Sequence, residues 1–222
     1  MKENRLVVLG AGGVGKTSLV VQYLEGFFTT TYKPTIEDYY RHAIRMPDGV
    51  FHSVEILDTA GSLNFPAMRE LCIKSGRGFI LVFSVDDVQS FHEAMEIWEI
   101  IVKLRGTRVP VIVVGNKTDL VEKRKVTQEM VTDALKERSA VYKYLETSAK
   151  MNINVAELFV ELLEYARQLE NPSPEPQPSR RLSRRLSSFG NINLTIRRKS
   201  SVPKVNEVKK EKVKAEPKCI IS

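Results

Sequence analysis

The sequence predicts an α/β fold of three layers, in which a six-stranded, mostly parallel sheet with one antiparallel strand carries helices on both faces. Three observations lead to this prediction. Strand-like and helix-like segments alternate through residue 169, an order typical of a largely parallel sheet. The tight turn Pro47-Asp48-Gly49 joins two neighbouring strands as a hairpin, which makes one strand antiparallel. The alternation then stops at Asn171, where the composition changes abruptly.

Strands are expected where short apolar or β-branched runs occur, and helices where apolar residues recur at helical spacing. The expected strands are residues 5–10, 39–46, 53–57, 78–85, 109–115 and 141–146. The expected helices are residues 15–25, 65–75, 90–104, 128–137 and 154–170. Apolar residues of the last helix share one face that should pack on the sheet, namely Val155, Leu158, Phe159, Leu162, Leu163 and Ala166.

The composition after residue 170 predicts a folded domain over residues 1–170 and a disordered tail over residues 171–222. Prolines alternate with polar residues up to Pro178, and Arg, Lys and Ser dominate from there. Such a segment cannot bury enough apolar surface to fold alone. The tail carries 13 Lys and Arg against 4 Asp and Glu, whereas the whole chain has a net charge of +7. The domain is therefore slightly acidic, and the basic character belongs to the tail.

Several classes of protein are disfavoured by composition. The two cysteines, Cys72 and Cys219, provide no disulfide framework and no Cys/His metal site, which suits a reducing, cytosolic compartment. Cys72 lies in an apolar helical setting and is expected to be a packing residue. The N-terminus has neither a signal-peptide pattern nor a glycine at position 2 for myristoylation. The longest apolar run, residues 79–83, is too short to span a bilayer.

A phosphate-binding loop follows the first expected strand and fits the pattern G-x-x-x-x-G-K-[ST]. Its glycines let backbone N–H groups surround an oligophosphate, and the helix that follows directs its positive end at the same charge. The lysine can reach the outer phosphates and the threonine hydroxyl can coordinate Mg²⁺. A glycine-rich turn with an incidental lysine is the alternative, and the flanking strand and helix argue against it. The loop predicts a nucleoside triphosphate site on a P-loop NTPase fold, built from Gly10, Ala11, Gly12, Gly13, Val14, Gly15, Lys16, Thr17 and Ser18.

Three further loops, each after an expected strand, point to guanine. In Asp58-Thr59-Ala60-Gly61 the aspartate can hold the Mg²⁺ shell through water, and the glycine can offer its N–H to the terminal phosphate. In Asn116-Lys117-Thr118-Asp119 the carboxylate can accept both donors of a guanine edge, which adenine cannot match. Ser148-Ala149-Lys150 supplies a loop that closes over the base. These loops in this order predict a guanine nucleotide.

With these motifs the sequence resembles the Ras superfamily of small GTPases over residues 5–169. The phosphate loop, the segment around Thr35, the three loops above and Phe28 all match. Within the Ras branch, residues 61–68, 79–85 and 147–152 are most similar to Di-Ras, with Dexras/Rhes-like and Ras-dva proteins as neighbours. The long serine- and arginine-rich tail departs from typical Di-Ras.

The resemblance implies a GTP/GDP switch that requires Mg²⁺, hydrolyses GTP and works with effectors, an exchange factor and a GTPase-activating protein. It implies catalytic roles for Lys16, Thr35, Gly61 and Ser62, and stacking of Phe28 on the guanine. Thr17, Thr35 and Asp58, the last through water, would hold the metal ion. The implied effector-binding segment consists of Tyr32, Lys33, Pro34, Thr35, Ile36, Glu37, Asp38, Tyr39 and Tyr40.

Ser62 departs from the family pattern, because most of the Ras branch has a glutamine there that orients the attacking water. Serine is too short to hold the same water, so slow intrinsic hydrolysis is expected. Compensation by another residue, such as Asn64, is a lesser alternative. A further alternative is a GTP-loaded scaffold whose hydrolysis is negligible.

The chain ends in Cys219-Ile220-Ile221-Ser222, a prenylation pattern whose terminal serine favours farnesyl. Basic clusters in the tail supply a second membrane signal, so we expect anchoring at the cytoplasmic face of the plasma membrane. Ser183, Ser187 and Ser200 each follow a basic pair or triplet and resemble sites for basophilic kinases, which predicts a cytosolic pool after phosphorylation. Nucleic-acid binding through the tail is disfavoured, because Phe189 is its only aromatic residue.

Overall fold

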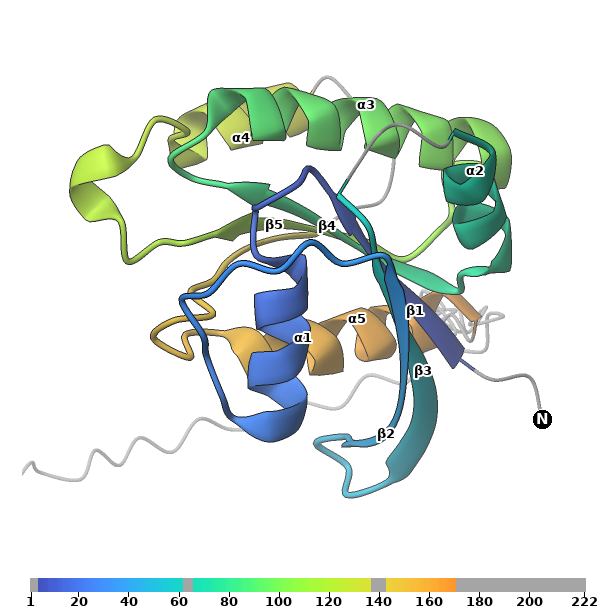
Figure 1. Ribbon diagram of the computed structural model, residues 1–222. Helices are drawn as coiled ribbons and strands as arrows, with labels where there is room; N and C mark the ends of the chain where they lie inside the picture. The colour runs from blue at the N-terminus through green and yellow to red at the C-terminus, as the bar shows by residue number, and fades with distance from the viewer. Residues whose placement is uncertain (1–3, 62–65, 137–142, 171–222) are drawn as a thin grey trace, which may run out of the picture. The chain divides into compact units, whose positions relative to one another are not determined.

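The computed structural model describes residues 4–61, 66–136 and 143–170, which form a sheet covered by helices (Figure 1). Within this part of the chain the sheet has six strands in the order β2-β3-β1-β4-β5-β6. Only the β2–β3 pair is antiparallel, and every other pair is parallel. The predicted fold class is therefore confirmed. The strands are β1 (Asn4–Gly10), β2 (Glu37–Arg45), β3 (Phe51–Thr59), β4 (Gly78–Ser84), β5 (Val111–Asn116) and β6 (Lys143–Glu146).

The helices cover both faces of the sheet. One face packs against α1 (Lys16–Glu25) and α5 (Val155–Glu170). The other packs against α2 (Pro66–Ser75), α3 (Val88–Arg105) and α4 (Gln128–Lys136), as Figure 1 shows. Because both faces are covered, the central strands are apolar at nearly every position rather than at alternate ones. None of the helices in the described ranges is both long and apolar enough to cross a membrane.

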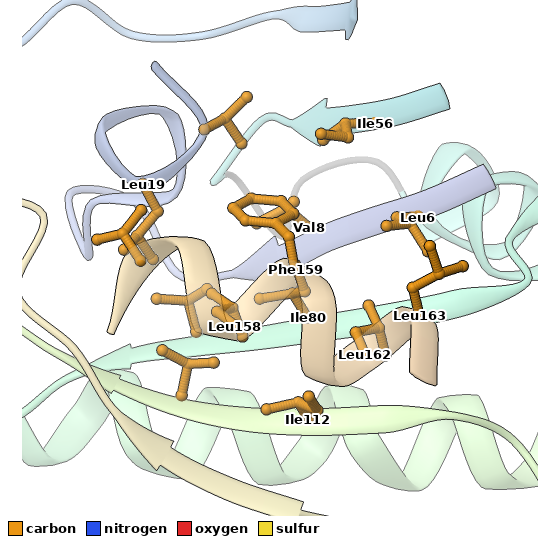
Figure 2. Packing of buried hydrophobic residues seen from close by; sticks show 14 of the residues in the cluster. Leu6, Val8, Leu19, Ile56, Ile80, Ile112, Leu158, Phe159, Leu162 and Leu163 are labelled. Atoms are coloured by element: carbon orange, nitrogen blue, oxygen red, sulfur yellow. The ribbon is translucent and has the colours of Figure 1, made fainter. Parts of the chain in front are cut away.

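Two cores result from the alternation of side chains along each strand. In β1, Leu6 and Val8 point into the core beneath α1 and α5, whereas Val7 and Leu9 point toward α2 and α3. Figure 2 shows the first core, where Phe159 of α5 lies against the strands. The predicted apolar face of the last helix is buried, except that Ala166 is half-buried and Tyr165 joins the buried set.

The hairpin is longer than predicted, and this matters for the site. Its ladder pairs Glu37 with Thr59, two residues beyond each predicted strand end. The start of β2 thus reaches the edge of the sheet where β1, β3, β5 and β6 end, and ligands of open α/β sheets bind at that edge. Two smaller differences lie nearby: a 3₁₀ turn at Val121–Lys123 was not predicted, and β6 begins at Lys143, with residues 141–142 outside the described part.

Candidate nucleotide-binding site

A cavity of about 800 Å³ opens at the carboxyl edge of the sheet. It falls within the size range of small-molecule pockets. The loops after β1, β3, β5 and β6 and the segment before β2 all contribute to its wall. Of the residues predicted to bind nucleotide, it is lined by Gly12, Gly13, Gly15, Lys16, Thr17, Ser18, Phe28, Thr35, Gly61, Asn116, Lys117, Asp119, Ala149 and Lys150.

The phosphate loop presents a buried cation at one end of this cavity. Gly15 has a φ of +97°, and α1 begins at the next residue, so the helix N-terminus faces the cavity. The ammonium of Lys16 donates hydrogen bonds to the carbonyl oxygens of Gly10 (2.9 Å) and Ala11 (2.7 Å). Burial lowers the pKa of Lys16 to about 8, and the nearby carboxylate of Asp58 opposes this shift. An anionic ligand here would stabilise the charged form of Lys16 and raise its pKa again.

The Asn116 side chain connects the loops around this cavity. Its amide nitrogen donates to the carbonyl oxygen of Val14 (2.9 Å), which ties the phosphate loop to the end of β5. Its amide oxygen accepts from the Thr147 hydroxyl and the Ala149 N–H, both at 3.2 Å. Asn116 therefore joins three of the predicted loops and acts by positioning them.

The carboxylate of Asp119 is placed by the loop after β6. The hydroxyl of Ser148 donates to Asp119 Oδ1 at 2.6 Å, and the same hydroxyl accepts from the Met151 N–H. The Ser148 side chain is fully buried, so its position is fixed by the surrounding structure. Asp119 itself is half-buried and lines the cavity beside Lys117 and Ala149.

The model of the Ras family matches residues 5–168 of the chain. The chain belongs to the Ras family. As a small GTPase of this family, it binds GTP and GDP with Mg²⁺, hydrolyses GTP and acts as a switch together with effectors, exchange factors and activating proteins. The match covers all the loops that line the cavity and ends two residues before the last described residue.

The oxygen atoms that a Ras-family GTPase needs for Mg²⁺ lie together in this protein. The Thr17 hydroxyl donates to Asp58 Oδ2 at 2.6 Å and lies 2.7 Å from the Thr35 hydroxyl. Asp58 is fully buried, and its Oδ1 has no hydrogen-bond partner in the described part of the chain. Burial raises the pKa of Asp58 to about 6, and the Thr17 hydrogen bond opposes this shift. A buried carboxylate with one unpaired oxygen beside two hydroxyls suits a hard cation, so these residues fit the metal ion.

Five of the predicted nucleotide-binding residues lie behind the cavity wall. They support the residues that line it, and they are Gly10, Ala11, Val14, Asp58 and Ser148. Sequence reasoning missed other residues of the wall, namely Val21, Phe27, Thr29, Thr30, Thr31, Thr59 and Leu120. The three consecutive threonines directly after Phe28 were a usable signal, because this segment must bridge α1 and β2 beside the base.

The implied effector segment lies on the surface of this GTPase. Ile36 is 89% exposed, Tyr32 and Tyr39 are also exposed, and β2 is an edge strand. Glu37 Oε1 accepts hydrogen bonds from the Tyr39 hydroxyl (3.0 Å) and the Cys72 thiol (3.5 Å). Cys72 is half-buried and packs against the core on the α2 and α3 side, as predicted, and burial, with Glu37 adding to it, raises the pKa of its thiol to about 11.

Three sets of predicted site residues lie outside the described part of the chain. Ser62 and Asn64, which bear on hydrolysis, fall in residues 62–65. Cys219 and the tail serines fall in residues 171–222. Their roles stay predictions.

Proposed function

We propose that this protein is a membrane-anchored signalling switch of the Di-Ras type that hydrolyses GTP slowly. The observation that carries the switch is the contact between Thr17 and Thr35, whose hydroxyls lie 2.7 Å apart. It links the helix behind the phosphates to the segment that continues into Glu37 and β2. Thr35 would hold Mg²⁺ together with Thr17, so GTP loading would stabilise the effector surface and loss of the terminal phosphate would release it.

Hydrolysis requires the chain to hold the phosphates, stabilise developing charge and position water. Lys16 and the N–H groups of the phosphate loop supply fixed positive charge to the oxygens that become more negative. Gly61 lies on the cavity wall, where its N–H can orient the terminal phosphate. The remaining task, positioning of the attacking water, falls to residue 62, where this chain has serine.

The nucleotide bound to protein isolated from cells tests the proposed switch. Rapid extraction and chromatography should recover guanine nucleotide at about one per protein, with a detectable GDP fraction. GTP alone, unchanged after prolonged incubation of the purified protein, would favour the GTP-loaded scaffold instead. A protein that contains no guanine nucleotide would contradict both.

Replacing Ser62 by Gln should accelerate intrinsic hydrolysis, because a longer amide side chain can hold the water that serine cannot reach. Misplacing a reactant by about 1 Å costs on the order of 10²-fold, and partial recovery of roughly 10-fold is expected. Single-turnover hydrolysis of preloaded GTP measures the rate, with Ser62→Ala as the control that should stay slow. Wild-type protein as fast as Ser62→Gln without any activator would show that Ser62 is not limiting. Because position 62 is not glutamine, we also expect the activating protein to insert an amide side chain.

The proposed anchor combines a farnesyl group on Cys219 with the basic tail. A single lipid chain gives only marginal membrane binding, so a second signal is needed. Basic residues near an anionic leaflet contribute roughly 1 kcal/mol each. The tail has a net charge of +9, which supports the cytoplasmic face of the plasma membrane as the location.

Changing Ser183, Ser187 and Ser200 together to Glu should shift farnesylated protein from anionic vesicles into solution. Full phosphorylation would add roughly −5 to −6 charges and offset more than half of the tail's positive charge, and three glutamates reproduce part of this effect. Co-sedimentation with vesicles measures the bound fraction, beside a triple-Ala variant that keeps the tail charge and a Cys219→Ser variant that lacks the lipid. If the triple-Glu protein binds as well as wild type while Cys219→Ser stays soluble, the lipid suffices and the electrostatic switch is wrong.

A further inference from the structure

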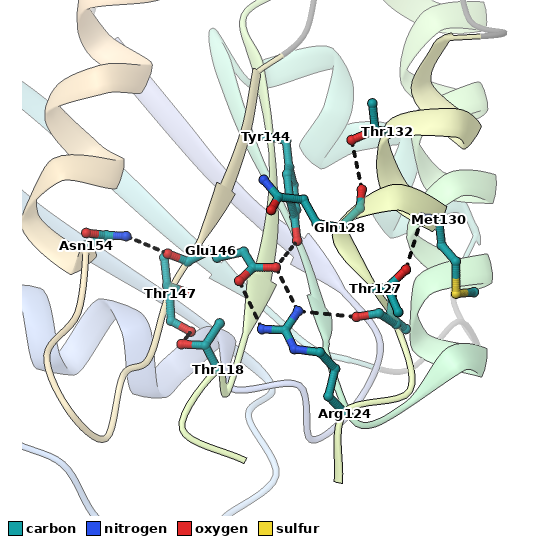
Figure 3. Close-up of polar contacts among 11 residues, drawn as sticks. Thr118, Arg124, Thr127, Gln128, Met130, Thr132, Tyr144, Glu146, Thr147 and Asn154 are labelled. Carbon is teal, nitrogen blue, oxygen red and sulfur yellow. Dashed lines mark hydrogen bonds and ion pairs between the residues drawn. The ribbon is translucent and has the colours of Figure 1, made fainter. Parts of the chain in front are cut away.

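A polar cluster of Arg124, Glu146 and Tyr144 lies beside the two loops that bind the base (Figure 3). The guanidinium of Arg124 donates two hydrogen bonds to the Glu146 carboxylate, from Nη1 to Oε1 at 2.8 Å and from Nη2 to Oε2 at 2.9 Å. The Tyr144 hydroxyl donates to Glu146 Oε1 at 2.9 Å. None of the three residues lines the nucleotide cavity. We call these three residues the base-loop brace.

The base-loop brace connects segments that are far apart in the sequence. Arg124 directly follows the 3₁₀ turn Val121–Lys123 and lies five residues after Asp119. Glu146 is the last residue of β6, two residues before Ser148. The ion pair therefore joins the continuations of both base-binding loops through residues that do not line the cavity.

The geometry makes the base-loop brace stiff. Bidentate arginine–carboxylate pairs fix orientation as well as distance, and both side chains are largely buried, at 25% and 29% exposed. Hydrogen bonding to Arg124 lowers the pKa of Glu146, and the same contact raises the pKa of Arg124, so the pair is ionised at neutral pH. The Tyr144 ring is stacked nearly parallel to Phe83, at 6.3 Å and 8°.

Further hydrogen bonds transmit this constraint to the loops. The Thr118 N–H and hydroxyl both donate to the carbonyl oxygen of Thr147, at 3.1 and 3.0 Å. The Asn154 amide donates to the carbonyl oxygen of Glu146 at 2.8 Å. Displacing Glu146 would therefore shift Thr147, and with it the Thr118 side of the other loop.

We propose that the base-loop brace sets the lifetime of the bound guanine nucleotide, with Arg124, Glu146 and Tyr144 as positioning residues. The base leaves when the Asp119 and Ala149 loops separate, and the brace opposes that separation without touching the ligand. This inference rests on guanine binding in the cavity. It adds a determinant of release that lies outside the phosphate and metal contacts.

The test is the dissociation rate of a fluorescent GDP analogue from the full-length protein with excess unlabelled GDP. Arg124→Met and Glu146→Gln should each release it about tenfold faster, a change of roughly 1.4 kcal/mol. The double variant should release it no faster than the faster single variant, because both changes break one contact. Tyr144→Phe, which keeps the ion pair and the ring, should have a smaller effect. Single-turnover GTP hydrolysis should stay within about twofold of wild type, since the brace lies at the base end.

The Lys143–Glu161 ion pair provides a matched control. Its atoms lie 2.7 Å apart, and it joins β6 to α5 rather than to a base-binding loop. Lys143→Met and Glu161→Gln should leave GDP release unchanged. The proposal would be overturned if the Lys143 and Glu161 variants accelerated GDP release as much as the brace variants did. It would also be overturned if Glu146→Gln and Arg124→Met released GDP at the wild-type rate. Wild-type protein that fails to bind GDP would instead contradict guanine binding itself, so the two failures are distinguishable.

Discussion

Replacing Asp119 by Asn should weaken GTP binding on the order of 10⁴-fold, the loss typical of a site that leaves buried polar groups unpaired. The carboxylate would accept both donors on the guanine edge, and Ser148 holds it in place through a 2.6 Å hydrogen bond. An amide has only one accepting atom, so one contact becomes repulsive. Xanthine presents an acceptor where guanine presents its amino group, so the variant should bind xanthosine triphosphate instead.

Equilibrium titration with GTP and xanthosine triphosphate measures this exchange of specificity. Asp133→Asn is the control, because Asp133 is an exposed carboxylate on α4 that pairs with Lys136 at 3.2 Å. It should bind GTP like wild type. An Asp119→Asn protein with unchanged GTP affinity would refute the assignment of Asp119 to the base.

Replacing Gly10 by Ala should destabilise the protein by roughly 3 kcal/mol or more, because it combines backbone strain with overlap in a packed core. Gly10 has a φ of +143°, and a Cβ there would overlap the carbonyl oxygen of Val82 on the neighbouring strand. Backbone atoms of two paired strands cannot move apart without breaking the ladder between β1 and β4. The effect should also disturb the Lys16 ammonium, which donates to the Gly10 carbonyl.

Denaturant unfolding at saturating GDP measures the loss of stability in Gly10→Ala, with Gly49→Ala as the matched control. Gly49 also has a positive φ, +83°, in the β2–β3 turn, but nothing lies within 4 Å of a Cβ there. Backbone strain alone should lower the free energy of unfolding of Gly49→Ala by about 1–2 kcal/mol. If both variants lose the same stability, the contact with Val82 has no separate effect.

The order of the elements and the identity of the loops that line the cavity could be predicted from the sequence, because both depend on local patterns. The apolar composition of residues 78–85 alone predicts a buried strand, and the structure has the strand Gly78–Ser84 there. The turn Pro47-Asp48-Gly49 predicted the hairpin for the same reason, since turn chemistry depends on adjacent residues. The residue spacing within the phosphate loop likewise predicted Lys16 and Thr17 as site residues, and it required no knowledge of their neighbours in the folded protein.

Only the tertiary structure decided how those loops support one another. The strand order places Asn116 where its amide joins Val14 and Ala149, and it brings Thr17 to Thr35. The pairing of Arg124 with Glu146 spans 22 residues and carries no signature in either segment. Such contacts depend on strand register and on packing between distant elements, which the local pattern of residues does not encode.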